Sequence, residues 1–486
     1  MNKPIRVVSV FCLVLFMALL VNATYLMYVR ADDLSKDPNN RRVITAAFSR
    51  ERGAILVGKD AIARSVPSDD QYKFQRTYSQ PFKYAPVTGY FSWYGQTGIE
   101  RSQNAVLAGD DSRLFVTRLV DMLSNSDPKG GNVQLTIQAA AQDAAWDGLE
   151  NLPGDAQGAV VALEPTTGRV LAMASTPTFD PNNFASHDFS EVKDVSDRLN
   201  ADDRDPLINR AIGTTLPPGS TFKLVTAAAA IESGNYDADS MVPGGFKFKL
   251  PQSSTEIGNH DGGNCGGNRI TLTQAMEVSC NVTFLSLANE LGTEAMADQA
   301  EAFGFNSTQL EDLSGQAKSL YPRDMDPPQT AMSGIGQSNV TATPLQMAMV
   351  TAAIANDGDV MRPYVVDEVR APNLSVLDKT DPQTISKAIS SSTADELTKM
   401  LVATVEEGTA TPAQIPNVEV AGKTGTAQST AERPPYAWFV SFAPANDPKV
   451  AVAVLVQSSD TSRNEIAGGR LGGPIAKAIM EAVINR

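Results

Sequence analysis

The sequence predicts an α/β fold held outside a membrane by one N-terminal anchor. Residues 7–29 form an uncharged apolar run, and helical signals dominate residues 220–357. Apolar runs rich in β-forming residues lie on both sides of that helical segment, at 159–174 and 418–457. This arrangement indicates one α/β domain whose sheet is assembled from remote pieces, in a chain of 486 residues that is long enough for two or more domains.

The anchor is the first element. A helix over residues 7–29 would span the roughly 30 Å hydrocarbon core of a bilayer at about 1.5 Å per residue. Lys3 and Arg6 precede it, so residues 1–6 should form a cytoplasmic tail and the rest of the chain should lie outside the cytoplasm. A cleaved signal peptide is the alternative, but its apolar region would be shorter.

A polar stalk and a small mixed module should follow, over residues 30–135. A break rich in Gly, Pro and Ser at residues 124–132 marks the end of this module. The main domain should then occupy residues 136–486. A strand and a helix are expected at its start, followed by a hairpin around the turn-forming segment 164–169. An apolar-periodic helix at 472–485 closes the chain.

The composition excludes several kinds of chemistry. A net charge of −15 and a pI of about 4.7 argue against nucleic acid, whose binding needs a basic face. His187 and His260 are the only histidines, and both lie in polar segments typical of loops. A Ser-His-Asp triad or a histidine-rich metal site is therefore not expected, no cofactor is predicted, and any serine chemistry should use a lysine.

Two of the three cysteines lie outside the anchor. Cys12 falls within the apolar run, which leaves Cys265 and Cys280 as an even pair in an oxidising compartment. We predict that these two form a disulfide. Two free thiols are the alternative.

A serine and a lysine lie three residues apart in the segment PPGSTFKLVTAAAA. Residues 217–219 cannot easily continue a helix, so a helix should begin at about Ser220. Because residues three apart share a helix face, the Lys223 amine can lie near the Ser220 hydroxyl, and burial would lower the lysine pKa until it can act as a base. The alternative is an N-cap serine beside a surface lysine, and the second S-x-x-K, Ser190–Lys193, is interpreted as such a surface pair.

A second polar pair lies between two helical runs. Ser279 and Asn281 form an S-x-N pattern, which also occurs elsewhere in the chain but only here well after Ser220 and between helical segments. A hydroxyl in this position can relay a proton. An amide side chain can bond both the C=O and the N–H of a peptide.

The third polar group lies in the segment VAGKTGTAQ. Lys423 follows a short β-like run, and Gly425 permits close approach of another backbone. With Thr424 and Thr426, this segment offers a cation, two hydroxyls and free N–H groups, which suit a carboxylate and an adjacent carbonyl. An ordinary turn is the alternative.

Taken in order, S-x-x-K, S-x-N and K-T-G resemble the motif set of penicillin-binding proteins and serine β-lactamases. The chain looks like a class B penicillin-binding protein, a peptidoglycan D,D-transpeptidase, and most like the short actinobacterial type linked to cell division. Segments 52–56 and 95–109 are similar to the N-terminal module of that class, and most of residues 136–486 is similar to its transpeptidase domain. Gln138 and Ser338 depart from residues that are frequent in the family.

The resemblance implies a fold and a set of partners. The fold would be an antiparallel five-stranded sheet flanked by helices, with an all-helical subdomain, behind a small dimerisation or interaction module. The partners would be peptidoglycan stem peptides, β-lactams bound covalently at Ser220, and the cytoplasmic membrane. Because no glycosyltransferase segment is visible, a polymerase partner from the division machinery is also implied.

The resemblance also implies a role for each polar residue. Ser220 would attack the carbonyl between two D-alanines, with Lys223 as its base. Ser279 with Lys423 would pass a proton to the leaving D-alanine. Backbone N–H groups of Ser220 and Thr426 would hold the oxyanion. The substrate would be bound by Asn281, Lys423, Thr424, Gly425 and Thr426.

Other functions remain as alternatives. A D,D-carboxypeptidase would use the same groups with water as the acceptor. A class A β-lactamase would need a downstream glutamate, whereas the nearest similar string, at 196–200, precedes Ser220 and lacks it. A β-lactam sensor is disfavoured because no signalling region is visible before the anchor, and an inactive division scaffold is disfavoured because all three motifs are intact.

Overall fold

The structure is a computed structural model of the chain, and α1 (Lys3–Tyr28) is its first helix. Among the described residues, α1 is the one helix long and apolar enough to cross a membrane, and none of its residues is buried. It begins four residues before the predicted apolar run. The structure describes all residues except 1–2, 31–33, 35–44, 46–47, 116–118, 120–122, 125–128, 261, 428–433, 464–465 and 486.

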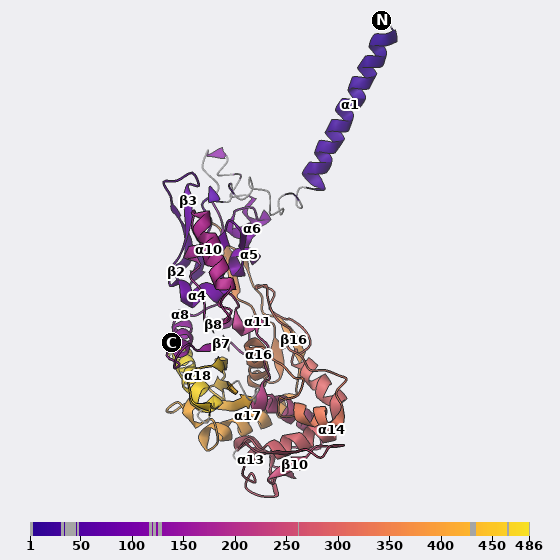
Figure 1. Cartoon of the computed structure of the whole chain (residues 1–486), viewed down its shortest axis with the longest axis vertical. Coiled ribbons are helices and arrows are strands. Elements are labelled where there is room, and N and C mark those ends of the chain that lie inside the picture. Colours follow the sequence, from indigo (N-terminus) through magenta and orange to yellow (C-terminus); the bar gives the residue numbers. More distant parts are fainter. Residues whose placement is uncertain are drawn as a thin grey trace.

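The N-terminal module is built on a six-stranded mixed sheet, at the upper end of the globular part in Figure 1. Its strand order is β15-β14-β6-β1-β2-β3, with β1 and β6 parallel and the other pairs antiparallel. The strands are β1 (Ile55–Val57), β2 (Asp60–Pro67), β3 (Phe74–Tyr78), β6 (Asn132–Leu135), β14 (Val366–Arg370) and β15 (Val376–Lys379). Small elements complete the module, namely α4 (Pro81–Thr88), β4 (Phe91–Ser92), β5 (Gly95–Gln96), α5 (Gly98–Ser102), α6 (Asn104–Leu107) and the 3₁₀ helix Ser112–Leu114.

Two strands of this sheet come from far along the chain. The predicted boundary between residues 135 and 136 falls directly after β6, but β14 and β15 lie within the predicted main domain. Backbone pairing of Val369 with Val133 joins them to the N-terminal module. The two modules therefore share a sheet, which the linear division of the sequence did not foresee.

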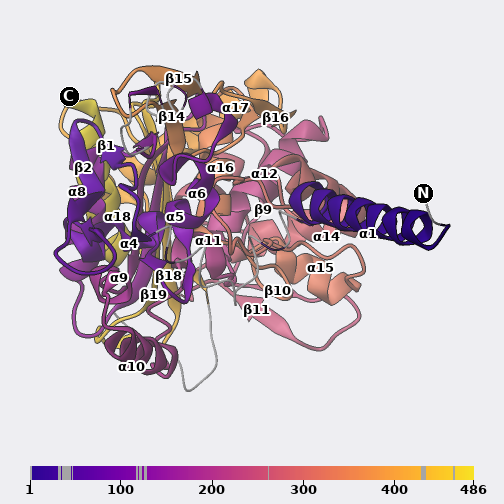
Figure 2. The ribbon, with the colours of Figure 1, turned by 90° about the horizontal axis from the view of Figure 1, so that it is seen from above.

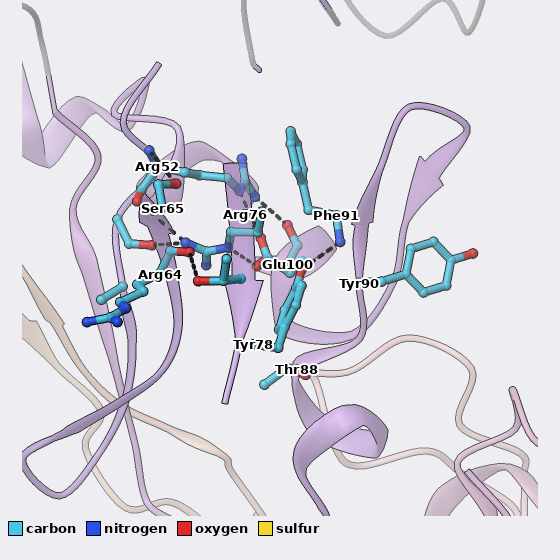
Figure 3. Close-up of polar contacts among 12 residues, drawn as sticks. Arg52, Arg64, Ser65, Arg76, Tyr78, Thr88, Tyr90, Phe91 and Glu100 are labelled. Carbon is cyan, nitrogen blue, oxygen red and sulfur yellow. Dashed lines mark hydrogen bonds and ion pairs between the residues drawn. The ribbon is translucent and has the colours of Figure 1, made fainter. Parts of the chain in front are cut away.

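The core of the N-terminal module contains a buried charge cluster (Figure 3). Glu100 on α5 accepts hydrogen bonds from Arg52 Nε at 2.8 Å and from Arg76 Nε at 2.6 Å, and all three side chains are almost fully buried. The Tyr78 hydroxyl donates to the same carboxylate at 3.1 Å. Burial alone would raise the pKa of Glu100, but Arg76 and Arg52 lower it below its ordinary value, so the carboxylate stays charged.

The main domain is built on an antiparallel five-stranded sheet of order β17-β18-β19-β7-β8, which confirms the predicted fold class. The predicted hairpin is the β7–β8 pair, and the other three strands come from the C-terminal part of the chain. Helices cover both faces, so these strands are buried along most of their length. The strands are β7 (Gln157–Leu163), β8 (Val170–Thr176), β17 (Ala421–Ala427), β18 (Tyr436–Ala443) and β19 (Val450–Ser458).

Alternate residues of each strand face different cores, as the two-residue period of a strand requires. Val160 packs with α8 (Ala139–Glu150) and α18 (Gly468–Ile484), whereas Val161 belongs to the larger core on the other face. Figure 2 shows α8 and α18 on one side of the molecule and the helical subdomain on the opposite side. The second face is covered by α16 (Pro344–Ala355) and α11 (Arg210–Gly213).

The predicted all-helical subdomain lies at the end remote from the N-terminal module (Figure 1). Its elements are α12 (Lys223–Glu232), α13 (Leu272–Glu277), α14 (Asn281–Ala302), α15 (Pro327–Ser333) and α17 (Ser391–Glu406). Short hairpins and bridges surround it, made by β9 (Met241–Pro243) with β12 (Arg269–Thr271), β10 (Lys247–Lys249) with β11 (Glu256–Gly258), and β13 (Asp359–Met361) with β16 (Thr384–Lys387). The remaining helices are α9 (Asn182–Ala185), α10 (Phe189–Asn200) and the 3₁₀ helix Thr411–Ala413.

Candidate active site

Ser220 lies on a 3₁₀ turn that precedes a buried helix. The sequence predicted a helix from about Ser220, but the α-helix α12 begins at Lys223, and Gly219–Phe222 forms the 3₁₀ helix η2. Gly219 has φ +55° and donates its N–H to the Gly336 carbonyl at 3.0 Å, which fixes the turn. Because side chains three residues apart nearly eclipse each other in a 3₁₀ helix, Ser220 and Lys223 still lie on one side.

Close backbone packing holds this turn against strand β17. A Cβ on Gly425 would lie 2.9 Å from Thr221 Cγ2 and 3.0 Å from the Pro218 carbonyl oxygen. A Cβ on Gly219 would lie 3.0 Å from the Ala427 backbone nitrogen. The glycine of K-T-G therefore lets the edge strand approach the serine turn, as the sequence suggested for a close backbone contact.

Ser279 occupies a break between α13 and α14. Its φ is +57°, in the left-handed region that non-glycine residues seldom adopt. The break expected between two helical runs is therefore present, and at this break the Ser279 side chain points toward two lysines. The Ser279 Oγ lies 3.1 Å from Lys223 Nζ and 2.9 Å from Lys423 Nζ.

Lys223 is fully buried on the first turn of α12. Its ammonium donates to the Ser279 carbonyl at 2.8 Å and to Asn281 Oδ1 at 2.8 Å, in addition to the Ser279 hydroxyl. Burial lowers the pKa of Lys223 well below its ordinary value, and the nearby charge of Lys423 lowers it further. In the described part of the chain no hydrogen bond joins Lys223 to the Ser220 hydroxyl, so the expected contact between them is not formed in this state.

Lys423 is also fully buried, on β17. Its ammonium donates to Ser279 Oγ and to the Thr424 carbonyl, each at 2.9 Å. Burial lowers the pKa of Lys423 to about 7, so the amine can gain or lose a proton near neutral pH. Among the described residues, no carboxylate forms an ion pair with Lys223 or Lys423.

The threonines of K-T-G face the opposite way from its lysine. Strand alternation places Thr424 and Thr426 on the side of β17 that lines a cleft, while Lys423 lies beneath. The Thr424 and Thr409 hydroxyls are 2.8 Å apart. Since β17 is an edge strand, part of its backbone N–H groups is not used in the sheet and can bind a ligand.

The cleft above these groups has a volume of about 830 Å³, which is enough for a peptide segment. Ser220, Ser279, Thr424 and Thr426 line it. The rest of its lining combines loops rich in Gly and Asn with the first residues of α18 and part of the 3₁₀ helix Thr411–Ala413, and the sequence did not indicate that these helix ends lie beside the motifs. These lining residues are Asn259, His260, Gly263–Gly266, Val278, Gly408, Thr409, Thr411, Pro412 and Ala467–Arg470.

One wall is tied to the S-x-N segment by the predicted disulfide between Cys265 and Cys280. Cys280 lies between Ser279 and Asn281. The bond therefore connects the loop that lines the cleft to Ser279, which both lysines contact, and to Asn281, which Lys223 contacts. His260 lies in this loop, as expected, and lines the cleft.

The other residues singled out in the sequence lie away from the cleft. His187 contacts the Asp70 carboxylate and packs against the rings of Phe48 and Tyr72. The second S-x-x-K pair lies on α10, where Lys193 forms an exposed ion pair with Asp197. The interpretation of that pair as a surface feature is confirmed.

Comparison with protein families gives two matches that together cover most of the chain. Residues 158–481 match the penicillin-binding protein transpeptidase domain, and residues 52–133 match the penicillin-binding protein A dimerisation domain. Among curated proteins, the chain is 42% identical to the peptidoglycan D,D-transpeptidase PbpA of Mycolicibacterium smegmatis, over all of this chain and 99% of that protein. It is 40% identical to PbpA of Mycobacterium tuberculosis with the same coverage.

Solved structures give the same result. The ceftriaxone acyl-enzyme complex of penicillin-binding protein A from M. tuberculosis superposes with a TM-score of 0.86 at 38% identity, over 90% of this chain and all of that one. The penicillin G acyl-enzyme complex of the same protein gives a TM-score of 0.84. With motifs, fold and full-length similarity in agreement, this chain belongs to the penicillin-binding protein transpeptidase family and is a class B member of it.

Proposed function

We propose that this chain is a peptidoglycan D,D-transpeptidase that works through an acyl-enzyme on Ser220. The observation that carries the proposal is the convergence of two buried, unpaired lysines, Lys223 and Lys423, on the Ser279 hydroxyl beside the cleft that holds Ser220. Burying a cation without a carboxylate is costly and lowers its pKa, so buried lysines of this kind beside a cleft are typical of functional sites. Lysines with a lowered pKa can transfer protons to and from a serine.

In the first half-reaction, Ser220 Oγ attacks the carbonyl carbon between the two terminal D-alanines of a stem peptide. Lys223 in its neutral form takes the hydroxyl proton, an event its lowered pKa makes possible. The contact with Ser220 should tighten when substrate binds, as catalytic hydrogen bonds often do. The C–O bond forms, the C–N bond breaks, and the proton reaches the leaving nitrogen through Ser279.

The K-T-G strand would hold the donor peptide. Thr424 and Thr426 face the cleft and offer hydroxyls to the terminal carboxylate, with the charge of Lys423 beneath them. The backbone N–H groups of Ser220 and Thr426 would bind the oxyanion. Asn281, which was expected to bind the peptide backbone, is not among the described residues that line the cleft, and its amide is engaged with Lys223 and Gly258.

In the second half-reaction, an amine from a neighbouring stem peptide takes the acyl group. The new C–N bond forms as the ester C–O bond breaks, and the amine proton returns to Ser220 by the same lysines. β-Lactams would acylate Ser220 and stop there. The relatives named as D,D-transpeptidases and the acyl-enzyme complexes of penicillin-binding protein A support this proposal.

Labelling with a fluorescent penicillin tests the acyl-enzyme. The wild-type protein should form a covalent, slowly released adduct, and Ser220→Ala should form none while keeping the wild-type melting temperature. A folded wild-type protein that takes no label would refute the proposal. Rapid release of the label would indicate a β-lactamase instead.

The choice of acceptor separates a transpeptidase from a carboxypeptidase. A synthetic thioester or peptide ending in D-alanine should give more aminolysis product than hydrolysis product when a D-amino acid is added as the amine. Hydrolysis alone, at all amine concentrations, would assign the carboxypeptidase function.

The placement in the cell follows from the anchor. We propose that residues 1–6 are cytoplasmic, that α1 spans the cytoplasmic membrane, and that the remaining chain is extracytoplasmic and works with a glycan polymerase in septal wall synthesis. Protease added to intact spheroplasts should digest the globular part. Protection of that part would reverse the topology.

A further inference from the structure

The N-terminus of α14 lacks the cap that its own sequence would normally supply. Cys280 occupies the N-cap position but makes no side-chain cap hydrogen bond, and its sulfur is committed to the disulfide with Cys265. The first N–H groups of a helix have no partner inside the helix. Here the groups next to the S-x-N segment must find a partner outside it.

Asn259, in the loop that lines the cleft, supplies that partner. Its Oδ1 accepts hydrogen bonds from the backbone N–H of Asn281 at 3.0 Å and of Val282 at 3.3 Å. Asn259 directly follows β11, and the carbonyl of the last residue of that strand, Gly258, accepts from Asn281 Nδ2 at 3.0 Å. One short segment therefore holds both the backbone and the side chain of Asn281.

The other end of the Asn259 amide fixes the loop itself. Its Nδ2 donates to the Gly245 carbonyl at 2.8 Å and to the Gly263 carbonyl at 2.7 Å. All four of these contacts are within hydrogen-bond distance, and the residue is half-buried and lines the cleft. Asn259 is thus a four-way connection between the cleft wall and α14.

This connection reaches the catalytic base. With its amide nitrogen held by Gly258, the side chain of Asn281 presents Oδ1 to Lys223 Nζ at 2.8 Å. Lys223 in turn lies 3.1 Å from Ser279 Oγ. A shift of Asn259 would therefore move the acceptor that orients the Lys223 amine, although Asn259 touches neither Lys223 nor Ser220 in the described contacts.

We propose that Asn259 is a positioning residue for acylation, acting through Asn281 on Lys223. The proposal rests on the proposed function, because it assigns Lys223 the role of base. The two ends of the Asn259 amide have different roles in this proposal. Its Oδ1 accepts hydrogen bonds from the start of α14, including Asn281, and its Nδ2 donates hydrogen bonds to carbonyls of the loop. The acceptor is the part that acylation needs.

Stopped-flow acylation by a fluorescent penicillin tests this on the disulfide-intact ectodomain or full-length protein, with the rate constant of acylation resolved from the dissociation constant of the initial complex. Asn259→Ala removes both parts and should lower the rate constant by about 10- to 100-fold, the size of effect expected when a catalytic group is displaced by about 1 Å. The dissociation constant should change much less. Asn259→Asp keeps two oxygen acceptors and loses the donor, and should recover most of the wild-type rate constant.

A matched control comes from the same loop. Asn268 is exposed and is not among the residues that line the cleft. Asn268→Ala should leave the acylation rate constant close to that of the wild type. Asn259→Ser, whose hydroxyl is too short to reach both helix N–H groups, should behave like Asn259→Ala and replaces it if the alanine variant does not fold.

The outcomes separate this inference from the proposed function. Equal rate constants for the wild type and a folded Asn259→Ala or Asn259→Ser would overturn it. A loss in Asn259→Asp, or in the control variant, as large as the loss in Asn259→Ala would also overturn it. A loss confined to the dissociation constant would show that Asn259 only shapes the cleft, and would also overturn it. Failure of the wild-type protein to acylate at all would instead refute the proposed function.

Discussion

Two buried clusters of charge in the described part of the chain are built in opposite ways. In the N-terminal module, Arg52 and Arg76 share the carboxylate of Glu100, and every charge has a partner (Figure 3). Beneath the cleft, Lys223 and Lys423 share the neutral hydroxyl of Ser279, and neither has an acidic partner among the described residues.

The difference separates a structural use of buried charge from a chemical one. The arginine cluster keeps its groups ionised, because opposite charges offset the cost of burial. The lysine cluster does not, and the pKa of Lys423 falls to about 7. In this molecule the buried cations without a carboxylate partner among the described residues are the ones proposed to transfer protons, whereas the paired cations connect segments of the N-terminal module.

The largest effect is expected from removing the base. Lys223→Met replaces a buried amine by an apolar chain of similar length and should lower the acylation rate constant by about 10² to 10⁴-fold, the usual contribution of general base catalysis. Penicillin labelling of the folded variant measures this. Acylation within about threefold of the wild type would remove Lys223 from the chemistry and weaken the comparison.

Removing the acid from the arginine cluster should affect stability instead. Glu100→Gln leaves two buried guanidinium groups without a counter-charge and should cost about 3–5 kcal/mol of unfolding free energy. Urea unfolding measures the loss, and Asp110→Asn, which disrupts the exposed pair with Arg50, is the control. The labelling rate per folded molecule should not change; a parallel fall in that rate would show that the two clusters are coupled.

The pH dependence of stability should distinguish the clusters further. Because the pKa of Lys423 is about 7 in the folded state and about 10.4 when unfolded, the unfolded state binds more protons between these values, and this group makes the protein more stable as pH rises. Lys423→Met has no amine to titrate at this position, so the unfolding free energy of the variant minus that of the wild type should be greatest below pH 7. This difference should fall by about 1.4 kcal/mol per pH unit above pH 7. Urea unfolding at pH 6.5 and 9 tests this, and a gap that stays constant would contradict the lowered pKa.

The smallest effect is expected at the exposed S-x-x-K pair. Lys193→Met breaks an ion pair with Asp197 in which both side chains are largely exposed, and such pairs contribute at most about 1 kcal/mol. Both the melting temperature and the labelling rate should stay close to wild type. A large change in either would show that spacing alone, without burial, makes this motif important.

The candidate catalytic residues could be proposed from sequence because each lies at the start or end of a predicted element. Ser220 follows two prolines and a glycine, Ser279 follows a helical run, and Lys423 begins the K-T-G segment of an apolar strand. The order of the three motifs, with only two histidines in the chain, pointed to lysine-based serine chemistry. The apolar runs indicated a sheet assembled from remote pieces, and its five antiparallel strands were implied by the family resemblance.

Tertiary contacts made by irregular segments could not be found in this way. Asn259 lies in a loop of Gly and Asn, and nothing in its local sequence indicates that its amide bonds the start of α14. The sequence did suggest a break between two helical runs at Ser279, but not the left-handed backbone that this residue adopts. The helix start that Asn259 contacts lies 22 residues further along the chain.

The strands β14 and β15 limit where the chain can be divided into fragments that keep both sheets intact. A fragment that ends near residue 133 would leave β6 with an open edge where β14 belongs, and a transpeptidase fragment starting at 136 would expose β14 in turn. Exchange of the N-terminal module between relatives would therefore have to carry a hairpin from the middle of the catalytic sequence. Because β14 and β15 belong to the same sheet as β1–β3, a displacement of that sheet is also passed directly to the middle of the transpeptidase sequence.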